Sequence, residues 1–403
     1  MFHIIKPGTR FDIVGKQKGF LALSALLVAA FIAVIVGMGP NYGIDFKGGS
    51  DIILSFNDSV TAEEVKDAAV QAGFPDATVQ QFGSSGKQFL VQTSAVSVVT
   101  EQGIDKVRAE IGKLSPIAKD TWSTNQPDRF DLKLEKATSL DALTGAVKAA
   151  GFEDFEVEQQ GKPEDNLYAV RFEDLGNQVR KGFEAAMGPK FVRTAEDGTK
   201  IYGLDRLETV GARVGNQLRE DGLTAVFLAL AAILVYIAVR FDIRYAPGAV
   251  VAVAHDVILS MGILTVIQME INLPILASIL TIVGYSLNDT IVVFDRIREN
   301  YTAGRGGSDL TEIVNTSINE TLNRTIVTSL TTLLAVATIF VLGSGLIQNF
   351  ALTLMIGVIV GTYSSVFVAS PILLLMDTWL RAREEARALR AKMSGEVVPA
   401  EDA

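Results

Sequence analysis

Two carboxylates within apolar stretches are the residues of this chain best placed to carry chemistry. Asp289 lies in the segment Val283–Asn300, VGYSLNDTIVVFDRIREN, six residues before the charged cluster that begins at Asp295. Asp256 lies in the apolar segment that precedes it. A carboxylate in hydrocarbon is costly, so an aspartate inside a membrane span indicates a functional site. Binding and releasing a proton is the chemistry that such a group can perform there.

A guanidinium, Arg324, is placed to act on these carboxylates. Asp289 lies about 9 Å along a helix from the charged end of its span. Asp256 follows Ala246 by ten residues, a comparable depth, and Arg324 opens a later span from the same side. We therefore expect the three side chains to share one layer of the membrane. Arginine stabilises the ionised form of a carboxylate and desolvation stabilises the neutral form, so helix movements would bind and release protons.

Structural roles remain open for each of these residues. Arg324 can be an anchor whose head group reaches the membrane interface. Asp256 can be a hydrogen-bonding group between neighbouring helices. Asp289 can play the same part, although Ser286 and Asn288 already supply polar groups beside it at lower cost.

Other chemistry finds little support in the sequence. The chain has no Cys and only two His, His3 and His255, so disulfides and thiolate sites are excluded and a His-based metal site is disfavoured. No G-x-x-x-x-G-K-[ST] motif occurs, and Gly83–Lys87 lacks the Ser or Thr after Lys. An intramembrane aspartyl protease needs a Gly-x-Gly-Asp context, which neither aspartate has. We predict no enzyme, no metal and no cofactor, with protons as the coupling ion.

Six apolar stretches are long enough to cross a bilayer, which takes about 20 residues. They occupy residues 20–39, 223–240, 246–267, 271–294, 324–345 and 349–376. The first can also be a cleaved signal peptide, but its length and the later spans favour an uncleaved anchor. The polar segment 295–323 is predicted as a loop whose part Ser308–Asn323 forms an amphipathic helix on the membrane interface.

Lys and Arg in the short flanks predict the orientation of these spans. They occur before the first span, between the second and third, after the fourth and in the tail, while loops 268–272 and 343–349 have none. The N-terminal residues 1–19 and the tail 377–403 are therefore expected in the cytoplasm. Residues 40–222 are expected on the outer side of the membrane.

Residues 40–222 form a separate acidic α+β domain. They hold 21 Lys and Arg against 30 Asp and Glu, which argues against nucleic acid as a partner. Ala72-Gly73-Phe74 recurs as Ala150-Gly151-Phe152, and around each copy the pattern predicts strand, helix, two strands and a further helix. We interpret this as two ferredoxin-like units, about 43–114 and 115–190, inserted into a polytopic α-helical membrane protein. Chance similarity of two short amphipathic segments is the alternative.

The motifs of this chain resemble the SecF family of the bacterial Sec protein-translocation machinery, in the resistance-nodulation-division (RND) superfamily. The resemblance rests on Gly43–Gly49, Val210–Arg219, Ala254–Asp256, Val283–Asn300 and Asn323–Leu330. It implies that Asp289 is a proton-pathway carboxylate, that Arg324 is its charged partner, and that Asp256 matches a family position. The residues that match the family motifs are Gly43, Asp45, Phe46, Gly48, Gly49, Asn288, Asp295 and Arg296.

The resemblance implies an RND-type half of six spans that works with SecD in a bacterial plasma (inner) membrane, with residues 40–222 in the periplasm. Such a pair uses the proton motive force to complete preprotein translocation after the SecYEG/SecA step. The implied partners are SecD, the SecYEG channel, YajC, unfolded preprotein and the lipid bilayer. The outer domain is about twice the size usual in the family, and the unit at about 115–175 is interpreted as a duplication. Half of a proton-coupled RND-type small-molecule exporter and a purely structural scaffold are the alternatives.

Overall fold

The computed structural model describes residues 10–82, 86–123, 126–240, 244–303 and 309–394. The chain divides into two units, one made of residues 1–41 with 222–403 and the other of residues 42–221. Residues 1–9 and 395–403, which belong to the two ends predicted to be cytoplasmic, lie outside the described residues. Six helices in the described residues are long and apolar enough to span a membrane, which confirms the predicted number.

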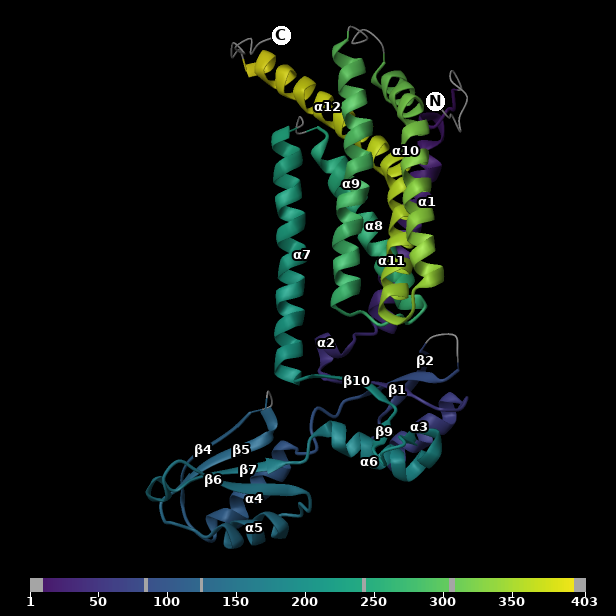
Figure 1. The fold of residues 1–403 in the computed structure, drawn as a ribbon. Helices are drawn as coiled ribbons and strands as arrows, with labels where there is room; N and C mark the ends of the chain where they lie inside the picture. Colours follow the sequence, from purple (N-terminus) through teal and green to yellow (C-terminus); the bar gives the residue numbers. More distant parts are fainter. Residues whose placement is uncertain (1–9, 83–85, 124–125, 241–243, 304–308, 395–403) are drawn as a thin grey trace. The chain divides into compact units, whose positions relative to one another are not determined.

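The membrane unit consists of long helices (Figure 1), and a π-helical turn separates the last two of them. Their bounds are α1 Gln17–Met38, α7 Ala212–Arg240, α8 Ala246–Val266, α9 Leu273–Thr302, α10 Leu310–Leu342, α11 Gly345–Ser364 and α12 Ser370–Ser394, with a π-helical turn at Ser365–Ala369. Within the described residues, the predicted interfacial helix at Ser308–Asn323 is the first part of α10, from Leu310 on, and α10 continues without a break. Val314 and Ile318 of this part are buried in the core of the membrane unit.

Helices α9 and α11 approach closely because glycine occupies the contact. A Cβ built on Gly357 of α11 would lie 2.1 Å from Cγ1 of Ile282, and one on Gly361 would lie 3.0 Å from Cβ of Ser286. Small residues at such contacts let backbones approach and let polar side chains meet across the interface. This contact sets the spacing of the polar groups described below.

The inserted unit contains two four-stranded antiparallel sheets, one in each of two lobes (Figure 1). The first lobe has the order β10-β1-β3-β2 and the second has β4-β5-β7-β6. The strands of the first lobe are β1 Gly49–Ser55, β2 Thr78–Phe82, β3 Gln88–Thr93 and β10 Leu204–Val210. Those of the second are β4 Ile117–Ser123, β5 Gln126–Leu134, β6 Phe155–Gln160 and β7 Leu167–Phe172. A short hairpin adds β8 Val192–Thr194 and β9 Lys200–Tyr202.

Two helices cover each sheet, and their assignment differs from the predicted tandem units. Helices α3 (Ala62–Gln71) and α6 (Leu175–Met187) cover the first sheet, with Val65, Val179 and Phe183 in one buried cluster. Helices α4 (Glu101–Gly112) and α5 (Leu140–Ala149) cover the second. The helix after β3 therefore belongs to the second lobe, and the helix after β7 belongs to the first.

This exchange makes the second lobe a circular permutation of the first. The first lobe runs β1-α3-β2-β3-α6-β10, the ferredoxin-like order, and the second runs α4-β4-β5-α5-β6-β7. Moving α6-β10 to the front of the first gives the order of the second. The inserted α+β domain is thus ferredoxin-like and duplicated, as predicted, and the second lobe is inserted between β3 and α6 of the first.

Candidate functional site

Asp256 on α8 is the centre of a hydrogen-bond cluster that joins three helices. Its Oδ2 accepts hydrogen bonds from Ser286 Oγ on α9 (2.5 Å) and Ser364 Oγ on α11 (2.7 Å). Its Oδ1 lies 2.9 Å from Nδ1 of His255. The side chain is fully buried, at 0% exposure. A buried polar group with a complete set of partners rigidifies its surroundings, which matches the structural role; a part in a proton pathway stays a prediction.

His255 extends this cluster toward α1. Its Nε2 is buried without a hydrogen-bond partner in the described part of the chain. The ring stacks on Tyr363 with 6.0 Å between centroids, and the Tyr363 hydroxyl lies 3.0 Å from Ser24 Oγ on α1. The π-helical turn begins two residues after Tyr363, and such turns are frequent at functional sites.

Asp289 on α9 has a different environment. It is 3% exposed, and its Oδ2 has no hydrogen-bond partner within the described ranges. Its electrostatic neighbours are Ser329 and Arg324, both on α10. Ser329 in turn hydrogen bonds Thr362 Oγ1 on α11 at 2.7 Å. Burying a carboxylate oxygen without a hydrogen-bond partner is costly, so Asp289 differs from Asp256 in the completeness of its contacts; its part in a proton pathway stays a prediction.

Arg324 lies on an exposed face of α10. None of the ion pairs between described residues includes it, although it acts electrostatically on Asp289. Asp256 and Asp289 are not bonded to each other; they are connected through α9, because Ser286 binds Asp256 and precedes Asp289 by three residues. Arg324 is thus an electrostatic neighbour of Asp289, and Asp256 lies in a separate hydrogen-bond cluster; the proton-pathway roles of the three residues stay predictions.

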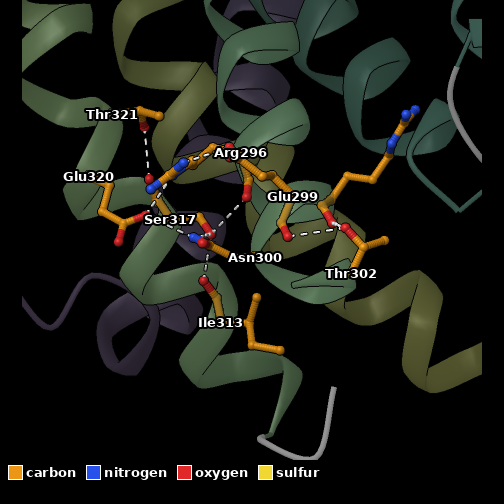
Figure 2. Close-up of polar contacts among 9 residues, drawn as sticks. Arg296, Glu299, Asn300, Thr302, Ile313, Ser317, Glu320 and Thr321 are labelled. Carbon is orange, nitrogen blue, oxygen red and sulfur yellow. Dashed lines mark hydrogen bonds and ion pairs between the residues drawn. The ribbon is translucent and has the colours of Figure 1, made fainter. Parts of the chain in front are cut away.

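A polar cluster joins α9 to α10 beyond Asp289 (Figure 2). Arg296 Nε donates to Glu320 Oε2 at 2.7 Å, and Asn300 Nδ2 donates to the same oxygen at 2.8 Å. Asn300 also donates to Ser317 Oγ at 2.9 Å. Of the motif residues predicted on this helix, Arg296 belongs to the cluster, while Asn288 and Asp295 are exposed.

The glycine-rich motif forms the turn into the first strand of the inserted unit. Gly43 is the N-cap of the short helix α2 (Ile44–Lys47), within which Asp45 lies in the first turn and Phe46 is buried. Gly48 and Gly49 have φ of +78° and +133°, values that L side chains rarely adopt. A Cβ on Gly49 would also lie 2.5 Å from the Thr93 carbonyl oxygen. This geometry explains both glycines structurally and gives no support to a phosphate-binding loop.

A cavity of about 480 Å³ lies within the inserted unit, and its lining includes residues of both lobes together with Val214 and Leu218 of the same unit. Aliphatic side chains supply much of its wall, among them Leu175, Leu207 and Val210. Three carboxylates also line it, Asp128, Glu173 and Asp174, and none of the lining residues is Lys or Arg. Its volume lies within the range of ligand-binding clefts, about 300–1,000 Å³.

Sequence reasoning missed several residues of these clusters. Ser364 and Ser329 lie in apolar stretches, and a serine there gives no signal of which helix it faces. Glu320 was interpreted as part of an interfacial helix. The charged spacing Glu320 to Arg324, four residues apart on one helix, was the available signal for it.

Two family models match this chain. One describes the C-terminal part of the SecD/SecF protein export membrane proteins and matches residues 193–379, and the other describes the SecD/SecF GG motif and matches residues 33–60. With its six spanning helices and inserted α+β unit, the chain is a multi-pass membrane protein of the SecD/SecF export class. Comparison with individual proteins assigns the chain to one family within this class.

The protein translocase subunit SecF of Desulfurispirillum indicum is 36% identical over 361 residues, which cover 89% of this chain and 88% of that protein. SecF of Escherichia coli O157:H7 is 40% identical over 250 residues, 61% of this chain and 74% of that one. The chain belongs to the SecF family of protein translocase subunits.

The crystal structure of SecDF from Thermus thermophilus, described as a translocon-associated membrane protein, has the same fold. It aligns with a TM-score of 0.60 at 28% identity, over 92% of this chain. The present chain spans 39% of that longer chain. The likeness supports the RND-type half that the motifs predict.

Proposed function

We propose that this chain pairs with a SecD subunit and uses the proton motive force to complete preprotein translocation after the SecYEG/SecA step. The observation that carries the proposal is Asp289, a buried carboxylate with an unpartnered oxygen beside Arg324 of the neighbouring helix. A carboxylate in this environment binds a proton when the guanidinium is distant and releases it when the guanidinium approaches. Movement of α9 against α10 is thereby coupled to proton passage.

A partner half is part of this proposal. RND-type transporters place their sites at the interface of two related halves, and this chain aligns with 39% of the solved SecDF chain. We place both termini in the cytoplasm and the inserted unit in the periplasm, on the charge of the short loops. YajC is an additional candidate partner. The chain acts as a transport subunit, not as an enzyme.

The inserted unit would contact the emerging polypeptide. Its cavity offers aliphatic walls and three carboxylates, a lining suited to an unfolded segment that carries apolar and basic side chains. Under this proposal the unit limits backward movement of the preprotein while the membrane unit moves protons.

The test uses inverted membrane vesicles that contain this chain, SecD and SecYEG. Completion of a preprotein arrested partway is followed with and without a proton gradient, for wild type, Asp289→Asn and Glu312→Gln. Glu312 is an exposed carboxylate on α10, so its variant controls for loss of a charge. The gradient should accelerate wild type and Glu312→Gln but not Asp289→Asn at equal abundance. An equal response of Asp289→Asn would reject the proton role and favour a scaffold.

Co-purification distinguishes the translocase from an exporter half. A tagged chain extracted in mild detergent should retain SecD and SecYEG. Retention of a different RND-type half, without SecD, would support the small-molecule exporter instead.

A further inference from the structure

Glu320 of α10 has two arginines within its reach, Arg296 of α9 and Arg324 of its own helix. In the structure it binds Arg296. Its Oε2 accepts hydrogen bonds from Arg296 Nε and Asn300 Nδ2 of α9 (Figure 2). Arg296 is also held by Glu299 at 2.5 Å, and Asn300 by Ser317. These contacts fasten α10 to α9 at the end of the helix pair beyond Asp289.

The second arginine is Arg324, one turn further along α10. Residues four apart on a helix face each other, and a carboxylate four residues before a cation is the favourable order for an ion pair. In the structure Arg324 has no ion pair with a described residue and acts on Asp289 instead. Glu320 can therefore reach Arg324 by a change of side-chain rotamer once the contacts with Arg296 and Asn300 of α9 open.

We propose that Glu320 is a positioning residue that exchanges Arg296 for Arg324 and so controls when Arg324 acts on Asp289. While Glu320 binds Arg296 and Asn300, α9 and α10 are fastened and Arg324 is available to the carboxylate. When α9 moves away, Glu320 binds Arg324 and withdraws it from Asp289. This inference rests on the proposed proton role of Asp289.

The position of the cluster suits this exchange. Helix α10 has 33 residues, about 50 Å at 1.5 Å per residue, which exceeds the roughly 30 Å of a bilayer core. Its first part can therefore lie outside the hydrocarbon, where ion pairs open at modest cost. Arg296 and Glu320 are about one third exposed, at 35% and 32% of their side chains. A contact of this kind can break and re-form, whereas the buried Asn300–Ser317 hydrogen bond keeps the two helices in register.

The test is a pair of substitutions that separate an exchange from a simple fastening contact. Arg296→Gln removes the charged contact of Glu320 with α9 and leaves the charge of Glu320 intact. Glu320 then exchanges to Arg324, and gradient-driven translocation falls about tenfold, a coupling of roughly 1.4 kcal/mol. Adding Glu320→Gln removes the competing charge. The double variant should then regain at least half of the activity that the single variant lost. Arg298→Gln, an exposed arginine of the same helix, and Glu312→Gln are the matched controls and should behave as wild type.

A simple fastening contact predicts the opposite pattern. Both changes break the same contact, so the double variant would be no more active than Arg296→Gln. That result would overturn the proposal, as would wild-type activity of Arg296→Gln itself. Thermal unfolding of each variant in detergent shows whether a loss of activity is a loss of folding.

A second readout does not depend on translocation. Carbodiimides modify protonated carboxyl groups, so labelling of Asp289, measured by mass spectrometry of its peptide, reports whether Arg324 acts on it. Labelling should rise in Arg296→Gln to the level of Arg324→Gln and return toward wild type in the double variant. The exchange is rejected if labelling of Arg296→Gln equals wild type. Failure of the proton role alone would leave this pattern intact while Asp289→Asn responds normally to the gradient.

Discussion

The contact between α9 and α11 allows a quantitative test of the membrane unit. Gly357 faces Ile282, and a Cβ on Gly357 would lie 2.1, 2.2 and 2.7 Å from Cγ1, Cδ1 and Cγ2 of that side chain. Ordinary contacts between carbon atoms lie at about 3.5–4.0 Å, so Gly357→Ala must move α9 from α11 or force Ile282 from its rotamer. Overpacking of this kind costs about 1–3 kcal/mol.

The displacement has a local consequence. Ser286 lies one turn after Ile282 on α9 and donates to Asp256 at 2.5 Å, a distance that does not tolerate separation of the helices. Gly357→Ala should therefore lower the melting temperature by about 2–4 °C for each kcal/mol lost. Gly284→Ala is the matched control, because a Cβ on Gly284 meets nothing within 4 Å, and it should leave the melting temperature unchanged.

The assay uses the two tryptophans of the chain, Trp122 and Trp379. In a Trp122→Phe background, fluorescence of Trp379 on α12 follows unfolding of the membrane unit in detergent. Ile282→Ala removes the three atoms that obstruct the new methyl group and should rescue part of the loss. Two results would refute the close contact of α9 and α11. In the first, Gly357→Ala is as stable as Gly284→Ala. In the second, adding Ile282→Ala to Gly357→Ala lowers the stability further, by the full cost of a cavity.

Three further predictions concern single side chains. Asp256→Asn should retain hydrogen bonds to both serines, so the melting temperature of the membrane unit falls by only a few degrees, whereas Asp256→Leu loses all of them and falls further. Burial raises the pKa of Asp76, but hydrogen bonds from Ser94 and its neighbour more than offset this and hold the pKa below its ordinary value. Its stabilisation is therefore present above the unfolded pKa, about 3.9, and is lost as pH falls through the folded pKa; Asp76→Asn should make the Trp122-detected melting temperature less sensitive to pH below about 5. Thr61→Ala removes the capping box with Glu64 at the start of α3 and should destabilise the inserted unit by about 1 kcal/mol, measured by the same fluorescence.

Local patterns in the sequence predicted most of the local structure. Thr61 and Ser139 are the N-caps of α3 and α5, a position that Thr and Ser favour, and Gly73 and Gly151 adopt a positive φ after those helices, as glycine does at helix ends. The partner of each helix was not predictable in this way. The apolar faces of α4 and α6 could pack on either sheet. An amphipathic pattern shows that one face of a helix is buried, but it does not show which sheet covers that face.

The polar clusters of the membrane unit show the same limit. A charged residue in an apolar segment is visible in the sequence, so Asp256, Asp289 and Arg324 were all identified. The partners that separate their roles come from other helices, and a serine such as Ser364 gives no sign of its neighbour. Helix α10 continues through its polar first part because Asp309 caps its start and buried residues follow at once.

Asp256 and Asp289 show why burial alone does not assign a role to a carboxylate. Both are buried in neighbouring helices, but Asp256 accepts hydrogen bonds from two serines and lies against His255, whereas Asp289 keeps an oxygen without a partner in the described structure. A carboxylate whose oxygens are all in contact with polar groups of other residues holds the neighbouring helices together. A carboxylate with incomplete contacts in the presence of a movable guanidinium changes its charge at smaller cost. The proposed proton carrier is therefore Asp289, whereas Asp256 on α8 joins α9, the helix of Asp289, to α11.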